Sequence, residues 1–178
     1  RFINHILPDK INMLNVSFLV PHLRKEFGGC AGNIAYNYKM IGGRPLPFGT
    51  VGEDFAPYES WLDRLAIPRD FVTEMPTTYT AQAFITTDLD DNQITAFHPG
   101  AMEFSATNDI ASVDTAEIGI IAPDDKEGML VHAKQMSDRS IPFIFDPGQG
   151  MPMFDSEELV DLIELADWVS VNEYEAEV

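Results

Sequence analysis

Short apolar runs alternate with segments of helical spacing along this sequence after residue 28. The apolar runs that we predict as buried strands are 46–51, 118–122, 142–145 and 168–171. The segments that we predict as helices are 33–41, 54–65, 125–136 and 156–166. Strands separated by helices are joined by crossover connections, which make neighbouring strands parallel. We therefore predict an α/β fold built as a three-layer α/β/α sandwich.

Residues that start and stop helices flank these segments. Gly42 and Gly43 end the first predicted helix, and Pro68 follows the second. The side chains expected to cap the amino ends of the other helices are Asp54, then Asp124 or Asp125, and Ser156.

Two segments interrupt the strand–helix alternation. Residues 81–87 and 93–98 read as strands on either side of the polar stretch 88–92, which predicts a β-hairpin. Residues 11–20 mix β-branched and polar residues without helical periodicity. We therefore expect a small β lid beside a partial α/β core, with the lid at 1–27 and 71–98 and the core at 28–70 and 99–178.

The charge balance excludes one class of partner. Lys and Arg number 11 against 29 Asp and Glu, so the net charge is −18. Such a chain repels phosphate backbones, and we predict that it binds no nucleic acid. No apolar stretch reaches the roughly 20 residues that cross a bilayer, so we predict no membrane partner. The single cysteine excludes an internal disulfide and fits a reducing compartment, so we predict a cytoplasmic protein.

The densest candidate site is the run from Gly28 to Asn33, which reads Gly-Gly-Cys-Ala-Gly-Asn. Small residues before a helix let main-chain N–H groups approach a ligand closely. Asn33 adds two donors and an acceptor, which match vicinal hydroxyls. A glycine-rich turn that only allows close helix packing explains the same residues equally well. No Gly-Lys-Ser/Thr follows, so this is not a P-loop.

Further candidates follow from the expected topology. Ligands of parallel sheets bind at the carboxyl ends of the strands, and this rule predicts a common rim for Gly28-Gly29, Val51-Gly52, Asp146-Pro147 and Asn172. Gln149 lies just beyond Asp146, where it could contact a ligand or simply belong to a turn. Asn172 and Glu175 would share a helix face and hold hydrated Mg²⁺, although a capping box has the same spacing.

The hairpin offers two kinds of candidate. Phe84 and Phe97, on opposite arms, could face a flat ring or simply pack between lid and core. Asp88, Asp90 and Asn92 begin like a calcium loop, but its glycine and final glutamate are replaced by Gln93 and Pro99, which favours a solvated hairpin tip. The four histidines and one cysteine show no metal-ligand spacing.

Taken in order, these motifs resemble the carbohydrate-kinase family (PfkB type) that includes ribokinase and adenosine kinase. The segments that carry the resemblance are Gly28-Gly29-x-x-x-Asn33, Val51-Gly52-x-Asp54, His98-Pro99-Gly100-Ala101-Met102, Phe145-Asp146-Pro147 and Asn172-x-x-Glu175. The opening residues and the segments Thr86–Asp88 and Phe97–Met102 are similar to bacterial adenosine kinases of the mycobacterial type.

The resemblance implies transfer of the ATP γ-phosphate to a primary hydroxyl of a nucleoside, with Mg²⁺, and adenosine as acceptor. It implies that Gly29 and Asn33 bind ribose hydroxyls, with Gly28 also among the substrate-binding residues. It implies that Phe97 packs on the base and that Gln149 lines the nucleoside pocket. It further implies that Asn172 and Glu175 organise Mg²⁺ and phosphate. The catalytic base and the ATP pocket would lie beyond Val178, so we expect the 178 residues alone to be inactive.

The acceptor stays open at this point. Ala83 stands where the mycobacterial type has a second aromatic residue, and we expect Phe84 next to it to point to the other face. Met151-Pro152-Met153 stands where that type has an arginine near the base. The alternatives are a sugar kinase with a ribose- or fructose-like acceptor and a non-catalytic nucleoside- or sugar-binding module. Exposed lid edges also suggest a homodimer through the lid.

Overall fold

The computed structural model describes residues 1–2, 17 and 19–177. The α-helices are α1 Cys30–Met40, α2 Ala56–Arg64, α3 Lys126–Asp138 and α4 Ser156–Leu165. The strands are β1 Phe48–Gly52, β2 Phe71–Met75, β3 Gln82–Thr87, β4 Gln93–His98, β5 Gly119–Ile121, β6 Phe143–Phe145 and β7 Trp168–Val169. The 3-10 helices after the hairpin are η3 Gly100–Thr107, η4 Ile110–Ser112, η5 Gly148–Met153 and η6 Glu175–Glu177. Our prediction for 11–20 falls mostly on residues outside the described ones.

The strands of the core pair in parallel, as the alternation predicted. β1 pairs with β2 in one sheet, and β5, β6 and β7 form another in that order. The helices between them supply the crossovers that parallel pairing requires. All four predicted core strands exist, each shorter than its apolar run or shifted by a residue or two.

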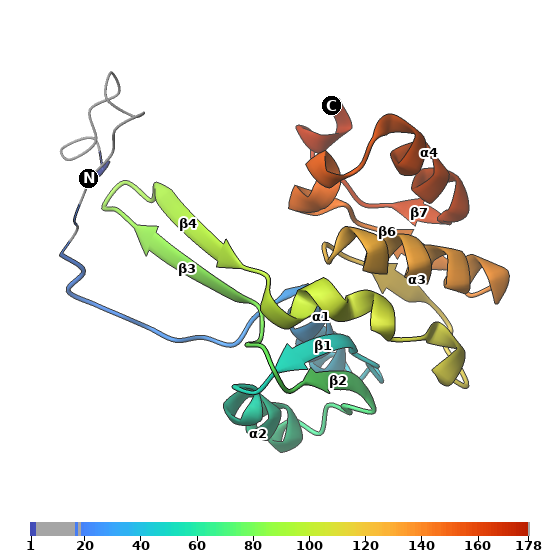
Figure 1. Ribbon diagram of the computed structural model, residues 1–178, viewed down its shortest axis with the longest axis horizontal. Helices are drawn as coiled ribbons and strands as arrows, with labels where there is room; N and C mark the ends of the chain where they lie inside the picture. Colours follow the sequence, from blue (N-terminus) through green and yellow to red (C-terminus); the bar gives the residue numbers. More distant parts are fainter. Residues whose placement is uncertain (3–16, 18, 178) are drawn as a thin grey trace.

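Each parallel sheet has its own packed core. α1 and α2 pack beside β1 and β2 around Ala35, Phe55, Leu62 and Ile67. α3 and α4 pack on the second sheet, where Phe143 and Phe145 of β6 are completely buried. In Figure 1, α2 with β1 and β2 lies at the lower end, and α3 and α4 cover the second sheet at the upper right. Burial of these apolar side chains is the main stabilising contribution to both units.

One buried amide joins the two units. The Asn108 side chain donates to the Gly49 carbonyl of β1 at 2.8 Å and accepts from the Thr73 hydroxyl of β2 at 2.6 Å. Its backbone carbonyl lies 3.1 Å from Nε2 of His132 in α3. A buried polar side chain needs such partners, and here they tie the first sheet to the helix that covers the second.

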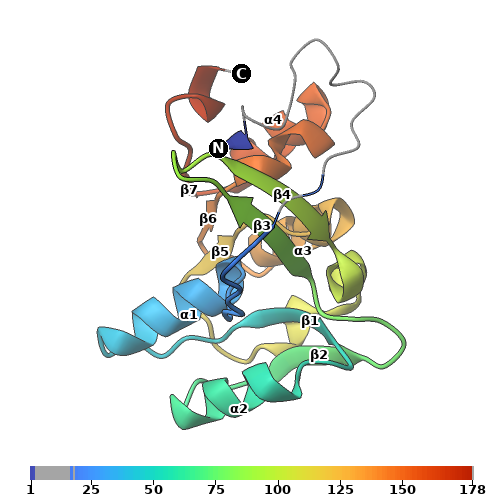
Figure 2. The same ribbon diagram turned by 90° about the vertical axis from the view of Figure 1, so that its left-hand side faces the viewer.

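The predicted hairpin is confirmed. β3 and β4 pair antiparallel, and β4 is exposed along its whole length. The ribbon projects away from both parallel sheets in Figure 1 and points towards the viewer in Figure 2. At its tip, the Asp88 carboxylate accepts the backbone N–H groups of Asp90 and Asn92, so this residue closes the turn.

One strand was not predicted. β2 lies inside the range 71–98 that we assigned to the lid, but it pairs in parallel with β1. The hairpin itself begins only at Gln82. The apolar spacing of β2 is interrupted by Thr73 and Glu74, so its position depends on pairing with β1 rather than on a local pattern.

Two predicted helix caps were wrong, and one open alternative is decided. Asp54 does not cap α2, whose N-cap position is Phe55, because the aspartate bonds the hairpin base instead. Ser156 is the first residue of α4, and Asp155 before it is the cap. Of the two aspartates before α3, Asp125 makes the capping hydrogen bonds.

Candidate functional site

The turn before α1 is open and depends on glycine. Gly29 has φ of +84° and ψ of 149°, a combination that residues with a side chain rarely adopt. No atom of the described residues, apart from chain neighbours, lies within 4 Å of a Cβ built on Gly28 or Gly29. This turn, Gly28–Gly29, therefore leaves its backbone accessible at the positive end of a helix.

Asn33 stands one turn into α1 and adds a free carboxamide. Its backbone N–H donates to the Gly29 carbonyl at 2.9 Å, which fixes the residue to the glycine turn. The residue is exposed, and within the described part of the chain its side-chain amide has no hydrogen-bond partner. The turn and this amide together present donors and an acceptor to a hydroxylated ligand.

Gly32, in contrast, serves close packing. A Cβ at Gly32 would collide with the hydroxyl of Tyr58 in α2. The close-packing explanation of the glycine motif therefore applies to Gly32, whereas Gly28 and Gly29 face open space.

Carboxylates from two strand ends approach the amino end of α1. Partial burial raises the pKa of the Cys30 thiol, and the charges of Asp146 and Asp124 raise it further. Burial also raises the pKa of the Asp146 carboxyl, and the charge of Glu175 adds to this shift. Charges influence each other over roughly 10 Å at 0.1 M salt, so these shifts link the start of α1 with Asp146, and Asp146 with Glu175, through charge alone. Among the residues of the predicted rim, these charge effects connect the start of α1 with Asp146.

Asn172 and Glu175 bond each other reciprocally. The Asn172 side-chain oxygen accepts the Glu175 backbone N–H at 2.9 Å, and a Glu175 carboxylate oxygen accepts the Asn172 backbone N–H at 3.0 Å. This is the geometry of a capping box, here at the start of η6. One oxygen of Glu175 makes no hydrogen bond to the described residues. The described residues contain no cluster of three His, Cys, Asp or Glu side chains that could hold a metal ion.

Phe97 lies on the hairpin. It is 55% exposed on β4, opposite Ala83, whereas Phe84 pairs with Ala96. Side chains on neighbouring positions of a strand alternate between faces, so Phe84 and Phe97 point to opposite faces of the hairpin. The expectation that both could face one flat ring is therefore wrong. The described residues show no hydrogen bond or ring contact between Phe97 and the turn before α1.

Gln149 lies in η5, directly after β6 and the Asp146-Pro147 step. It is exposed, and its side chain has no hydrogen-bond partner within the described part of the chain. Gly148 before it has a positive φ of +44° and packs against Pro123. The tight turn at Gly148 therefore places Gln149 close behind Asp146, at the carboxyl end of β6.

Asp54 has a role that the sequence did not indicate. Its carboxylate accepts the backbone N–H of Thr80 and the side-chain amide of Gln82, both at 2.7 Å. Gly52 donates its N–H to the Thr80 hydroxyl at 3.0 Å, and a Cβ on this glycine would collide with the 78–80 backbone. The Val-Gly-x-Asp motif therefore anchors the base of the hairpin. The motif was visible in the sequence, but its partners lie 26 and 28 residues away.

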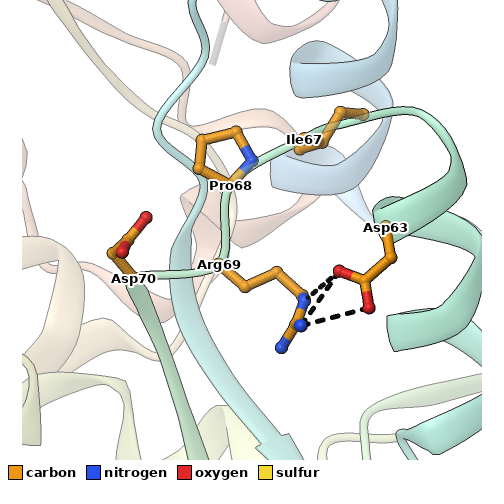
Figure 3. Close-up of a pocket in the computed structure, with 5 residues that line it drawn as sticks. All are labelled: Asp63, Ile67, Pro68, Arg69 and Asp70. Atoms are coloured by element: carbon orange, nitrogen blue, oxygen red, sulfur yellow. Dashed lines mark hydrogen bonds and ion pairs between the residues drawn. The ribbon is translucent and has the colours of Figure 1, made fainter.

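A shallow depression of about 380 Å³ lies elsewhere, in the loop between α2 and β2. Figure 3 shows Arg69 of this loop bonded to Asp63 of α2, and Arg69 also pairs with Glu59 at 2.6 Å. The loop leads into the amino end of β2, whereas the candidate rim lies at the carboxyl ends of strands. This ion-pair network holds the loop on α2 and is not part of the candidate site.

Among the described residues, no helix is long and apolar enough to cross a membrane.

Known proteins that resemble this chain are sugar and nucleoside kinases. The family model for pfkB family carbohydrate kinases matches residues 3–178. A nucleoside kinase of Methanocaldococcus jannaschii is 34% identical over 171 residues, which cover 95% of this chain and 56% of that protein.

Solved structures agree with this match. The nucleoside kinase of Burkholderia thailandensis in complex with inosine superposes with a TM-score of 0.89 at 48% identity, covering 99% of this chain and 56% of that chain. The same enzyme in complex with ADP-inosine superposes with a TM-score of 0.85 at 50% identity, again over 99% of this chain and 56% of that chain. The chain thus spans little more than half the length of these relatives.

These similarities agree with the parallel α/β core and with the order of the motifs. They confirm the ribokinase-like fold that the resemblance implied. The chain belongs to the PfkB family of carbohydrate kinases.

Proposed function

We propose that this chain is the acceptor-binding part of an ATP-dependent kinase that phosphorylates the primary hydroxyl of a nucleoside. One observation carries the proposal: the open glycine turn at the positive end of α1 stands one helical turn before Asn33, whose carboxamide has no hydrogen-bond partner among the described residues. Relatives that are nucleoside kinases, one of them solved in complex with inosine, support a nucleoside as the acceptor.

In this proposal the sugar lies on the turn before α1. The backbone N–H of Gly29 and the carboxamide of Asn33 bond the ribose hydroxyls, and Gly28 leaves room for the sugar. Phe97 packs on the base when the hairpin covers the site. Gln149 lines the nucleoside pocket from the turn after β6. Such contacts hold the primary hydroxyl in place for attack on the ATP γ-phosphate.

The residues at the carboxyl end of the core suit a hydrated Mg²⁺. Glu175 keeps one carboxylate oxygen free of hydrogen bonds to the described residues, and Asn172 lies beside it. The charge of Glu175 raises the pKa of Asp146, so two carboxylates share a region in which a cation relieves their repulsion. Mg²⁺ accepts one or two carboxylates and keeps several waters, which fits Asn172 and Glu175 as indirect ligands. Bound there, it would neutralise charge on the transferring phosphate.

Adenosine is the acceptor that we propose, with AMP as the product. The relative solved in complex with inosine makes inosine the nearest competitor. Because the hairpin supplies a single aromatic residue on the Phe97 face, opposite Ala83, base contacts are few and several purine nucleosides fit this proposal.

The whole protein is the unit to which this activity belongs. We propose that the full-length protein acts in the cytoplasm and that the 178 residues alone give no turnover. The exposed hairpin, with Phe84, Ile85, Ile94 and Phe97 each more than 40% exposed, is the surface through which we propose a homodimer. Light scattering of the full-length protein, with and without charged residues at Ile85 and Ile94, tests that pairing.

An acceptor panel tests the proposed function. Full-length protein is given ATP and Mg²⁺ with adenosine, inosine, ribose or fructose, and ADP formation is followed. We expect kcat/KM for a nucleoside to exceed that for either sugar at least 100-fold. Equal or better turnover of a free sugar supports the sugar-kinase alternative. Nucleoside binding by calorimetry with no ADP formation supports the non-catalytic binding module.

A further inference from the structure

A tyrosine from a neighbouring helix is bonded to the glycine turn. The hydroxyl of Tyr58 in α2 donates to the backbone carbonyl of Gly28 at 2.8 Å. Within the described residues no other side chain hydrogen-bonds the turn Gly28–Gly29. The two residues are 30 positions apart, so this bond depends on the packing of α2 beside α1.

This bond orients the peptide that links the two glycines. A trans peptide is planar, and its C=O and N–H point in opposite directions. When Tyr58 holds the Gly28 carbonyl on its own side, the N–H of Gly29 therefore points away from α2. Among the described residues, that N–H has no acceptor, and no atom apart from those of the chain neighbours lies within 4 Å of a Cβ built on Gly29. Gly29 lacks a side chain that would otherwise restrict its backbone, so an external contact has to fix this peptide.

The Tyr58 ring is itself held in place. Phe27 stacks on it with ring centroids 4.6 Å apart and planes 15° apart. Trp61 and Phe55 contact it at 5.6 and 5.5 Å. Aromatic pairs of this kind restrict the ring, so the hydroxyl meets the turn from one fixed direction. Phe27 also directly precedes Gly28, so the same ring holds the chain on entry to the turn.

Gly32 leaves the space that the hydroxyl needs. A Cβ at Gly32 would collide with the Tyr58 hydroxyl, and the next ring carbon would then lie 3.1 Å away. Glycine at this position of α1 costs helix stability relative to alanine. Gly32 therefore weakens α1, but a larger residue at this position would push away the Tyr58 hydroxyl and break its bond to Gly28.

We propose that Tyr58 is a positioning residue for acceptor binding: its hydroxyl fixes the Gly28–Gly29 peptide so that the Gly29 N–H faces the sugar. The inference rests on the proposed function, because it assigns this N–H to a nucleoside hydroxyl. Tyr58 itself touches neither substrate.

Steady-state kinetics of full-length protein carrying Tyr58→Phe test the role. The variant keeps the ring and removes only the hydroxyl. We expect KM for the nucleoside to rise about fivefold, as for loss of one neutral hydrogen bond, with KM for ATP and kcat unchanged within twofold. Tyr36→Phe is the matched control, because Tyr36 stacks on Trp61 in the same cluster and its hydroxyl has no partner among the described residues. It should change none of these values.

A second variant, at Gly32, disrupts the same bond between Tyr58 and Gly28. Gly32→Ala should raise KM for the nucleoside to a similar extent, since the new methyl group displaces the hydroxyl. In the double variant with Tyr58→Phe the effects should not add, because the bond is already lost. Thermal unfolding of each variant shows whether the fold is retained.

The outcomes separate the inference from the proposed function. If wild-type protein phosphorylates nucleosides but Tyr58→Phe leaves the nucleoside KM unchanged, the positioning role is wrong and the proposed function stands. If Tyr58→Phe raises both KM values and lowers the unfolding temperature together, the tyrosine is only structural and the inference is again wrong. If wild-type protein has no nucleoside kinase activity, the proposed function is wrong, and the inference that rests on it is wrong as well.

Discussion

The carboxylate of Asp54 accepts the backbone N–H of Thr80 across 2.7 Å and thereby fastens the start of the hairpin to the loop after β1. Gln82, the first residue of β3, bonds the other carboxylate oxygen. Partial burial raises the pKa of Asp54, but the bonds from Thr80 outweigh this effect, and the pKa lies below its ordinary value of 3.8. A lowered pKa means that the ionised form stabilises the fold.

Replacing this carboxylate should loosen the hairpin base. We expect Asp54→Ala to lower the free energy of unfolding by about 1 to 2 kcal/mol through loss of two hydrogen bonds to a charged group. Amide hydrogen exchange in β3 should accelerate. The stabilising effect of Asp54 should be complete above pH 3.8 and disappear as the pH falls through its lowered pKa. Glu53→Gln is the control, and equal protection of β3 in wild type and Asp54→Ala would contradict this account.

The two glycines of the turn should respond differently to alanine. Gly29→Ala forces a side chain into φ of +84° and should cost about 1 to 3 kcal/mol in the free energy of unfolding. Gly28 has no such φ, and both Cβ positions are open. Gly28→Ala should therefore change the free energy by less than about 0.5 kcal/mol. Urea unfolding of both variants measures the difference, and equal costs would show that backbone conformation is not the cause.

Removing the charge of Glu175 should change the titration of Asp146. Burial and the Glu175 charge both hold the pKa of Asp146 above its ordinary value of 3.8. Glu175→Gln keeps an oxygen that can accept the Asn172 N–H, and it should lower the pKa of Asp146. A raised pKa of an acid favours folding at low pH, and this contribution is lost as the pH rises through the raised value. NMR titration of the Asp146 carboxyl carbon tests this, and an unchanged pKa would exclude the coupling.

The cap of α4 gives a stability test. The Asp155 carboxylate accepts the backbone N–H groups of Glu157 and Glu158 at 3.0 and 2.9 Å. Asp155→Ala should lower the free energy of unfolding by about 1 kcal/mol. Ser156→Ala should have almost no effect, because Ser156 makes no capping bond. Chemical denaturation measures both variants. If Ser156→Ala lowered the free energy of unfolding more than Asp155→Ala did, the serine would be the cap.

Most of the core could be predicted because its signals are local. Buried strands such as 118–122 and 142–145 are short apolar runs, and the helices between them carry a 3.6-residue pattern. β2 was not predicted because polar residues interrupt its apolar pattern, and the strand forms through pairing with β1. The role of Asp54 escaped because an aspartate before a helix has the same sequence pattern whether it caps that helix or bonds a distant loop.

The candidate site was predictable to a similar degree. The glycine turn is a contiguous motif, and the charge effect of Asp146 on Cys30 agrees with the strand-end rule, which predicted a common rim for the start of α1 and Asp146. The pairing of Phe97 with Ala83, the neighbour of Phe84, depends on the hairpin register, which composition does not determine. Tyr58 gave no signal at all, since its contact with Gly28 exists only after α1 and α2 pack together.

One kinetic cycle tests the central claim, that Asn33 and the glycine turn bind the hydroxyls of a nucleoside sugar. Full-length wild-type protein and Asn33→Ala are assayed with adenosine and with 2′,3′-dideoxyadenosine, which keeps only the primary hydroxyl. We expect Asn33→Ala to lower kcat/KM for adenosine at least tenfold, as for loss of about 1.4 kcal/mol of binding, and to leave the dideoxy analogue unaffected. An equal loss with both acceptors, or no loss with adenosine, would contradict the account.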